Sequence, residues 1–136
     1  MSIEFGSDDI EHEHTVVRLD GTDLPIELFR SRHTDTGAAI IMGAEAFSPN
    51  TFIRRVCSRL AAAGHTIVLP DYFRGEGPTD PDNYDDLASA HDAIEALDFR
   101  RAAFDLVAAA RLARSFDDVD PDRVLAWGYC TGGTLA

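Results

Sequence analysis

The sequence contains no lysine, although 24 of its 136 residues are aspartate or glutamate. All 12 basic residues are arginine, and the formal net charge is −12 at pH 7. A surface of this sign repels a phosphate backbone, which argues against nucleic acid as a partner. Two explanations of the composition stay open. One is adaptation to high salt, where screening weakens repulsion between carboxylates, and we favour it. The other is the codon bias of a GC-rich genome.

Long apolar runs are also missing. The longest, such as residues 37–44 and 106–110, fall well short of the roughly 20 residues that a bilayer requires. The N-terminus is acidic and lacks the basic start and apolar centre of a signal peptide. We therefore expect a cytoplasmic protein without a membrane partner, with an acidic, flexible segment over residues 1–13 and one domain over residues 14–136. The sequence does not indicate an oligomeric state.

Cysteine is scarce, with only Cys57 and Cys130. Neither lies in a Cys-x-x-Cys or Cys/His cluster, which argues against a disulfide framework and against structural zinc. His12 and His14 form a His-x-His pair of the kind that can bind metal, but they lie in a segment that we expect to be frayed. We predict no metal and no cofactor. Cys57 lies one position away from the apolar stripe of a predicted helix, so we expect a buried, inert thiol.

Apolar periodicity predicts an α/β fold. Alternating residues over 14–20 and 24–30 predict a β-hairpin. Short runs that are apolar on both faces predict three buried parallel strands, over residues 38–42, 66–69 and 124–127. The segments between these strands have helical spacing, which gives right-handed strand–helix–strand crossovers.

Three helices are predicted between the strands. The first buries Phe52, Val56, Leu60 and Ala63 and stops at Gly64. The second is capped by Asp80 and buries Tyr84, Leu87, His91 and Ile94. The third is capped by Asp98 and buries Phe99, Ala102, Ala103, Leu106, Val107 and Ala110.

A Gly-x-Cys-x-Gly motif follows the last predicted strand, with Cys130 between Gly128 and Gly132. This is the cysteine form of the nucleophile elbow, a sharp strand-to-helix turn in which the two glycines permit close backbone packing. The following helix N-terminus favours a thiolate, and the backbone N–H of Thr131 would donate to an oxyanion. We predict that Cys130 is a nucleophile. A dinucleotide-binding loop would need Gly-x-Gly-x-x-Gly, a spacing that is absent here.

Several segments together resemble the dienelactone hydrolases. Residues 126–133, Ala-Trp-Gly-Tyr-Cys-Thr-Gly-Gly, resemble the elbow of that family. Residues 40–47 are similar to its strand ending in a Glu-x-Phe loop, residues 69–73 to its Pro-Asp-Leu-Tyr strand end, and residues 97–114 to the helix before the elbow. The match covers about residues 15–136 and implies the N-terminal half of an α/β-hydrolase fold, with a hairpin and three parallel strands joined by crossover helices. Because the sequence stops about one turn after the elbow, we expect a truncated chain.

The resemblance also implies roles for individual residues. Cys130 matches the nucleophile, and Glu45 matches a loop glutamate that holds the thiol and takes part in its activation. Ala46 would supply the second oxyanion N–H, beside that of Thr131. No arginine matches the family's substrate-carboxylate contact, and Arg74 is the nearest candidate. The implied reaction is the hydrolysis of a small-molecule ester, lactone or thioester without a cofactor, with the triad Asp and His after the elbow.

Two other functions for Cys130 stay open. A non-catalytic α/β binding module would keep the elbow as a scaffold, and an Asp and a His downstream would distinguish the enzyme from it. A redox or sensor thiol would need a resolving cysteine nearby, and only Cys57 is available.

Overall fold

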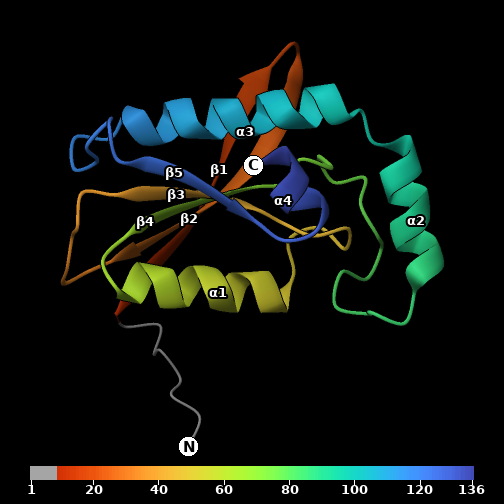
Figure 1. Ribbon diagram of the computed structural model, residues 1–136, viewed down its shortest axis with the longest axis horizontal. Coiled ribbons are helices and arrows are strands. Elements are labelled where there is room, and N and C mark those ends of the chain that lie inside the picture. Colours follow the sequence, from red (N-terminus) through yellow and green to blue (C-terminus); the bar gives the residue numbers. More distant parts are fainter. Residues whose placement is uncertain (1–8) are drawn as a thin grey trace, which may run out of the picture.

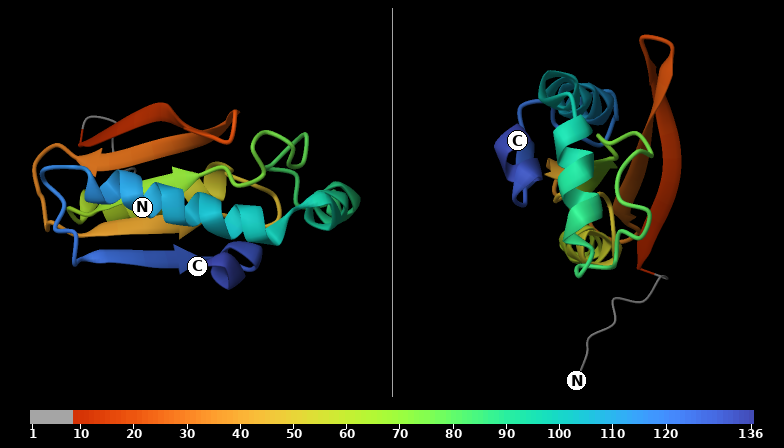
Figure 2. Two further views of the ribbon diagram at one scale, coloured as in Figure 1. Left: turned by 90° about the horizontal axis from the view of Figure 1, so that it is seen from above. Right: turned by 90° about the vertical axis from the view of Figure 1, so that its right-hand side faces the viewer.

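The computed structural model describes residues 9–136, which form one five-stranded sheet in the order β1-β2-β4-β3-β5. The strands are β1 (Ile10–Leu19), β2 (Thr22–Ser31), β3 (Ala39–Gly43), β4 (Thr66–Pro70) and β5 (Val124–Gly128). The helices are α1 (Thr51–Ala62), α2 (Leu87–Ala96), α3 (Phe99–Arg114) and α4 (Thr131–Leu135). Helices α1 and α3 cover opposite faces of the sheet, and α2 lies beyond one end of it (Figures 1 and 2).

The sheet is mixed, because the hairpin joins the parallel strands. β1 and β2 form the predicted antiparallel hairpin, β2 is antiparallel to β4, and β3 is parallel to both β4 and β5. β1 begins at Ile10, earlier than predicted, because Ile10 pairs with Ser31 and is only 7% exposed. The predicted flexible segment over residues 1–13 thus lies mainly outside the described residues, and its last four residues belong to β1.

The core lies around β3 and β4, which are buried along their whole length. All three predicted parallel strands are present within one or two residues of their predicted bounds. The expectation that the third is fully buried is wrong, because β5 lies at the edge of this sheet. Leu125 and Trp127 are 60% and 48% exposed.

Helix α1 has the predicted length but buries a neighbouring stripe, Ile53, Cys57 and Ala61. Phe52, predicted to be buried, is 44% exposed. Positions one residue apart differ by about 100° around a helix, so a small error in the predicted face moves the whole stripe. The burial of Cys57 is confirmed.

Helix α2 begins at Leu87 and not near Asp80, and this prediction is wrong for a local reason. The Asp80 carbonyl accepts from the N–H of Asn83 at 3.1 Å, and the Asp80 side chain accepts from the N–H of Asp82 at 3.2 Å. Such turns of Asp and Asn compete with a helix. Asp86 is the actual N-cap, and Tyr84 lies in the preceding loop.

Helix α3 is capped by Asp98, as predicted, and buries Ala102 and Leu106. Two predicted core residues, Phe99 and Val107, are 43% and 45% exposed. Within the described part of the chain, no helix is both long and apolar enough to cross a bilayer.

Candidate active site

Cys130 occupies a strained backbone conformation between β5 and α4. Its φ of 53° and ψ of −117° place it in a region that residues other than glycine rarely adopt. Its side chain is exposed, whereas Cys57 is buried. A strained, exposed cysteine at a strand-to-helix turn is the arrangement that the elbow motif predicts.

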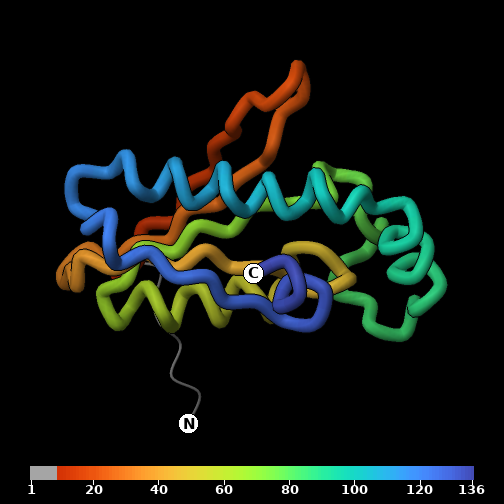
Figure 3. The backbone as a smooth tube through the Cα atoms, turned by 45° about the horizontal axis from the view of Figure 1, so that its top comes forward, coloured from red at the N-terminus to blue at the C-terminus, as the bar shows by residue number. Residues whose placement is uncertain are grey.

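Three glycines bring the ends of β3 and β5 against the start of α4. A Cβ atom on Gly128 would lie 2.2 Å from the carbonyl carbon of Gly132, and one on Gly132 would lie 2.1 Å from the carbonyl oxygen of Gly43. The N–H of Tyr129 donates to Gly43 across the same junction at 3.1 Å. Figure 3 shows the α4 turn beside the loop that follows β3. The fold thus places Cys130 next to the loop that carries Glu45 and Ala46.

The buried Tyr72 holds the loop that carries Glu45 and Ala46 in place. Its side chain is fully buried, and its hydroxyl donates to the Ala44 carbonyl, with a longer contact of 3.4 Å to the Glu45 carbonyl. Burial raises the pKa of Tyr72, and the charges of Cys130 and Asp71 add to this effect. Tyr72 therefore stays protonated and acts as a hydrogen-bond donor. It stands in the Pro-Asp-Tyr segment that supports the family resemblance, but the sequence assigned it no role.

The Glu45 carboxylate is held from two sides. Its Oε1 accepts from the Tyr84 hydroxyl at 2.5 Å and from Nδ2 of Asn50 at 3.1 Å. Within residues 9–136, no hydrogen bond joins Glu45 to the Cys130 thiol, and Oε2 of Glu45 accepts none. Glu45 is thus anchored through one oxygen while the other is free.

Asn50 and Tyr84 are functional candidates that the sequence did not reveal. Asn50 is fully buried, and it also caps α1 by accepting from the N–H of Ile53 at 3.1 Å. Asparagine is a favoured residue at this position directly before a helix. Tyr84 is brought in by the loop that follows β4. Asp82 in that loop accepts from the N–H and hydroxyl of Thr51 at 2.8 and 2.9 Å, which fastens it to the start of α1.

The two predicted oxyanion donors have free N–H groups. No oxygen of residues 9–136 accepts a hydrogen bond from the backbone N–H of Ala46 or Thr131. Thr131 is the first residue of α4, and the first N–H groups of a helix have no partner within that helix. Both N–H groups can therefore donate to a ligand.

Arg74 has a structural partner. Its guanidinium donates to the Asp105 carboxylate at 2.5 and 3.1 Å, and also to the hydroxyl of Thr22. The Asp105 side chain is fully buried, and that of Arg74 is 11% exposed. The pair fastens the loop after β4 to α3. The prediction that Arg74 contacts a substrate carboxylate gains no support from this geometry.

The comparisons with known proteins agree with the fold. The family model of the dienelactone hydrolase family matches residues 27–136. The chain is 34% identical over 120 residues to a carboxymethylenebutenolidase of Rhodococcus opacus, covering 88% of this chain and 44% of that protein. It is 33% identical over 100 residues to a carboxymethylenebutenolidase of Pseudomonas putida, covering 71% of this chain and 42% of that protein. It therefore spans less than half the length of these two curated relatives.

A solved structure shows the same architecture. A crystal structure from Klebsiella pneumoniae, provisionally assigned as a dienelactone hydrolase, superposes with a TM-score of 0.72 at 24% identity, covering 89% of this chain and 50% of that one. The five strands correspond to part of the α/β-hydrolase fold of such proteins. Because the family model covers most of the sequence, including the elbow, this chain belongs to the dienelactone hydrolase family.

Proposed function

We propose that the protein hydrolyses ester, lactone or thioester bonds of small molecules, with Cys130 as the nucleophile. The observation that carries the proposal is the backbone of Cys130, whose positive φ holds an exposed thiol at the turn between β5 and α4. Membership of the dienelactone hydrolase family supports the reaction class.

In the proposed reaction, the Cys130 thiolate attacks the carbonyl carbon of the substrate. The carbonyl electron pair moves onto oxygen, and the N–H groups of Ala46 and Thr131 stabilise the negative charge. The bond to the leaving oxygen (or sulfur) then breaks, and that atom takes up a proton. Water hydrolyses the thioester formed at Cys130, which releases an acid and regenerates the thiol. No cofactor enters this scheme.

Glu45 is proposed to assist the thiol. It lies directly before Ala46, and the Tyr84 and Asn50 hydrogen bonds leave Oε2 free. In this proposal, Oε2 approaches the Cys130 thiol when substrate binds and accepts its proton. In the alternative, Glu45 has no part in catalysis and its carboxylate only stabilises the loop through the Tyr84 and Asn50 hydrogen bonds.

The proposal is tested by labelling and mutation of the full-length protein. Iodoacetamide at pH 8 is expected to modify Cys130 well before Cys57, because burial raises the pKa of Cys57 and blocks access to it. Cys130→Ala should lower kcat/KM for p-nitrophenyl acetate by about 10³-fold or more, whereas the matched Cys57→Ala variant keeps the activity. Equal labelling of the two cysteines, or activity that survives Cys130→Ala, would contradict the assignment. A folded full-length protein without any esterase activity would instead favour the non-catalytic binding module.

A further inference from the structure

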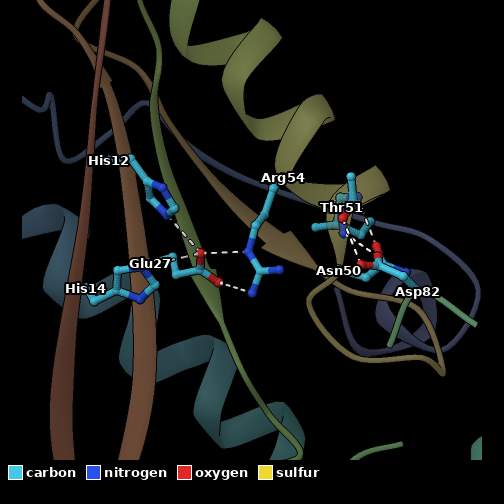
Figure 4. A network of polar contacts seen from close by, with 8 residues as sticks. His12, His14, Glu27, Asn50, Thr51, Arg54 and Asp82 are labelled. Carbon is cyan, nitrogen blue, oxygen red and sulfur yellow. Dashed lines mark hydrogen bonds and ion pairs between the residues drawn. The ribbon is translucent and has the colours of Figure 1, made fainter. Parts of the chain in front are cut away.

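Three metal-ligating side chains converge on one face of the hairpin. His12 and His14 alternate along β1 and therefore point to the same side, and Glu27 of β2 is the register partner of His14. Nε2 of His12 lies 2.8 Å from Oε1 of Glu27, and Nε2 of His14 lies 4.0 Å from it. One ligand atom from each of the three residues falls within 4.8 Å of the other two. Figure 4 shows both imidazoles directed at the carboxylate.

We propose that His12, His14 and Glu27 bind one divalent transition-metal ion of the Zn²⁺ class. Two imidazoles and one carboxylate are a ligand set that zinc uses in open sites, and imidazole also suits Ni²⁺, Cu²⁺ and Co²⁺. Metal–ligand bonds of about 2.1 Å in a tetrahedron place the ligand atoms about 3.4 Å apart. The observed separations bracket that value, so side-chain rotations can close the site without a movement of the strands.

Glu27 is already positioned to act as a ligand. Its side chain is only 9% exposed, and Arg54 of α1 holds it through Nε to Oε1 at 2.8 Å and Nη2 to Oε2 at 3.1 Å. An oxygen of a carboxylate has two lone pairs, and on Oε1 these face Arg54 and His12. A metal ion would take the lone pair that now faces His12 and leave the Arg54 contact in place. Hydrogen-bonded carboxylate ligands of this kind are usual in metal sites.

The surroundings allow a metal ion to complete its coordination. The His12 ring stacks on Phe29, with centroids 4.2 Å apart and planes 13° from parallel, which limits its rotation. A cavity of about 420 Å³ lined in part by His14, Glu27 and Asp71 lies beside the cluster and has room for water ligands. The positive charge of Arg54 opposes a cation, but the net charge of −12 favours one. The site is separate from Cys130, and the proposed hydrolysis does not need it.

The test uses the full-length, untagged protein in a Cys130→Ser background, because the exposed thiol would itself bind metal. Titration with Co²⁺ and then Zn²⁺ should show one ion per chain, with visible d–d bands and no thiolate-to-cobalt charge-transfer band. His12→Ala and His14→Ala should each weaken Zn²⁺ binding more than about tenfold. These side chains are 37% and 72% exposed, so their removal leaves the core intact, as circular dichroism would verify.

His91→Ala is the matched control. His91 is also an exposed histidine beside a carboxylate, 3.1 Å from Glu95, but it has no second histidine and should leave Zn²⁺ affinity unchanged. No Zn²⁺ bound at micromolar concentration would overturn the proposal, and so would equal affinities in the His14→Ala and His91→Ala variants. Either result would identify the cluster as a hydrogen-bonded His12–Glu27 pair. Neither result depends on ester hydrolysis, because Cys130 is absent throughout.

Discussion

The Glu45 carboxylate is tied to the scaffold through only one of its two oxygens. Both hydrogen bonds of the Glu45 carboxylate are accepted by Oε1. The backbone N–H of the next residue, Ala46, donates to no oxygen of residues 9–136. Under the proposed role of Glu45, loss of its negative charge affects the Cys130 thiol. The turn stays largely intact, since a glutamine oxygen can still accept from Tyr84 and Asn50.

Glu45→Gln in the full-length protein is accordingly expected to lower kcat by about 10- to 10²-fold, in the range of a lost acid–base contribution. The melting temperature should stay nearly constant. Glu76→Gln is the matched control, because Glu76 is an exposed carboxylate in the loop after β4. Kinetics of Glu45→Gln that match the control over the whole pH range would show that Glu45 only braces the loop.

At the scale of elements, the sequence predicts best where one physical signal dominates. β3 and β4 are short runs that are apolar on both faces, and their predicted bounds agree with the structure to within one residue. The tight turn between β5 and α4 follows from Gly128 and Gly132, where a Cβ atom would lie 2.2 Å and 2.1 Å from the neighbouring backbone. The α3 cap at Asp98 follows from a local hydrogen bond to the N–H of Arg101 at 3.0 Å.

Predictions failed where distant residues decide the outcome. The buried face of α3 includes Asp105, which apolar periodicity assigns to the surface, and its partner Arg74 lies 31 positions earlier. The Tyr84–Glu45 contact spans 39 positions and depends on a loop that periodicity placed in a helix. The local spacing of apolar residues does not encode either contact. The hydrogen bonds of Asn50 and Tyr84 to Glu45 are therefore visible only in the structure.

The Arg74–Asp105 pair should act on stability and not on substrate binding. Removal of Asp105 leaves a guanidinium that is only 11% exposed without its carboxylate partner, and Asp105→Ala should lower the free energy of unfolding by about 3–5 kcal/mol. Asp118→Asn is the control, since the Arg30–Asp118 pair is 3.7 Å long and more exposed, and it should cost about 0–1 kcal/mol. Urea unfolding of the full-length protein measures both. A raised KM in Arg74→Gln with an unchanged free energy of unfolding would instead support the predicted contact of Arg74 with a substrate carboxylate.

For the molecule as a whole, the charge distribution predicts a response to salt. With 24 acidic and 12 basic residues, repulsion between carboxylates opposes the compact state at low ionic strength. The melting temperature of the full-length protein should rise steeply between 0.05 and 2 M KCl, where the Debye length falls from above about 10 Å to below about 3 Å. Kosmotropic sulfate would stabilise most proteins, so KCl is the salt to use. A flat response would leave codon bias as the explanation of the missing lysine.

The 136 residues taken by themselves should not turn over an ester. Within the described part of the chain every histidine has a partner away from Cys130, namely His12 and His14 with Glu27, His33 with Asp9, His65 with Thr36 and His91 with Glu95. No imidazole is therefore in place to activate the water that must hydrolyse the acyl-enzyme. An activated ester such as p-nitrophenyl acetate should at most acylate Cys130 once. Mass spectrometry should then show one persistent acetyl group.

The same chain presents an apolar edge that can hinder the measurement. β5 pairs with β3 on one side, and its exposed Leu125 and Trp127 favour association with other strands. The assay therefore needs material that light scattering shows to be monomeric, with Cys130→Ala treated in parallel. Steady multiple turnover by the monomeric 136-residue chain, abolished by Cys130→Ala, would mean that these residues contain a general base that the structure does not reveal. A single acylation of Cys130 without turnover would instead show a competent nucleophile that lacks its base.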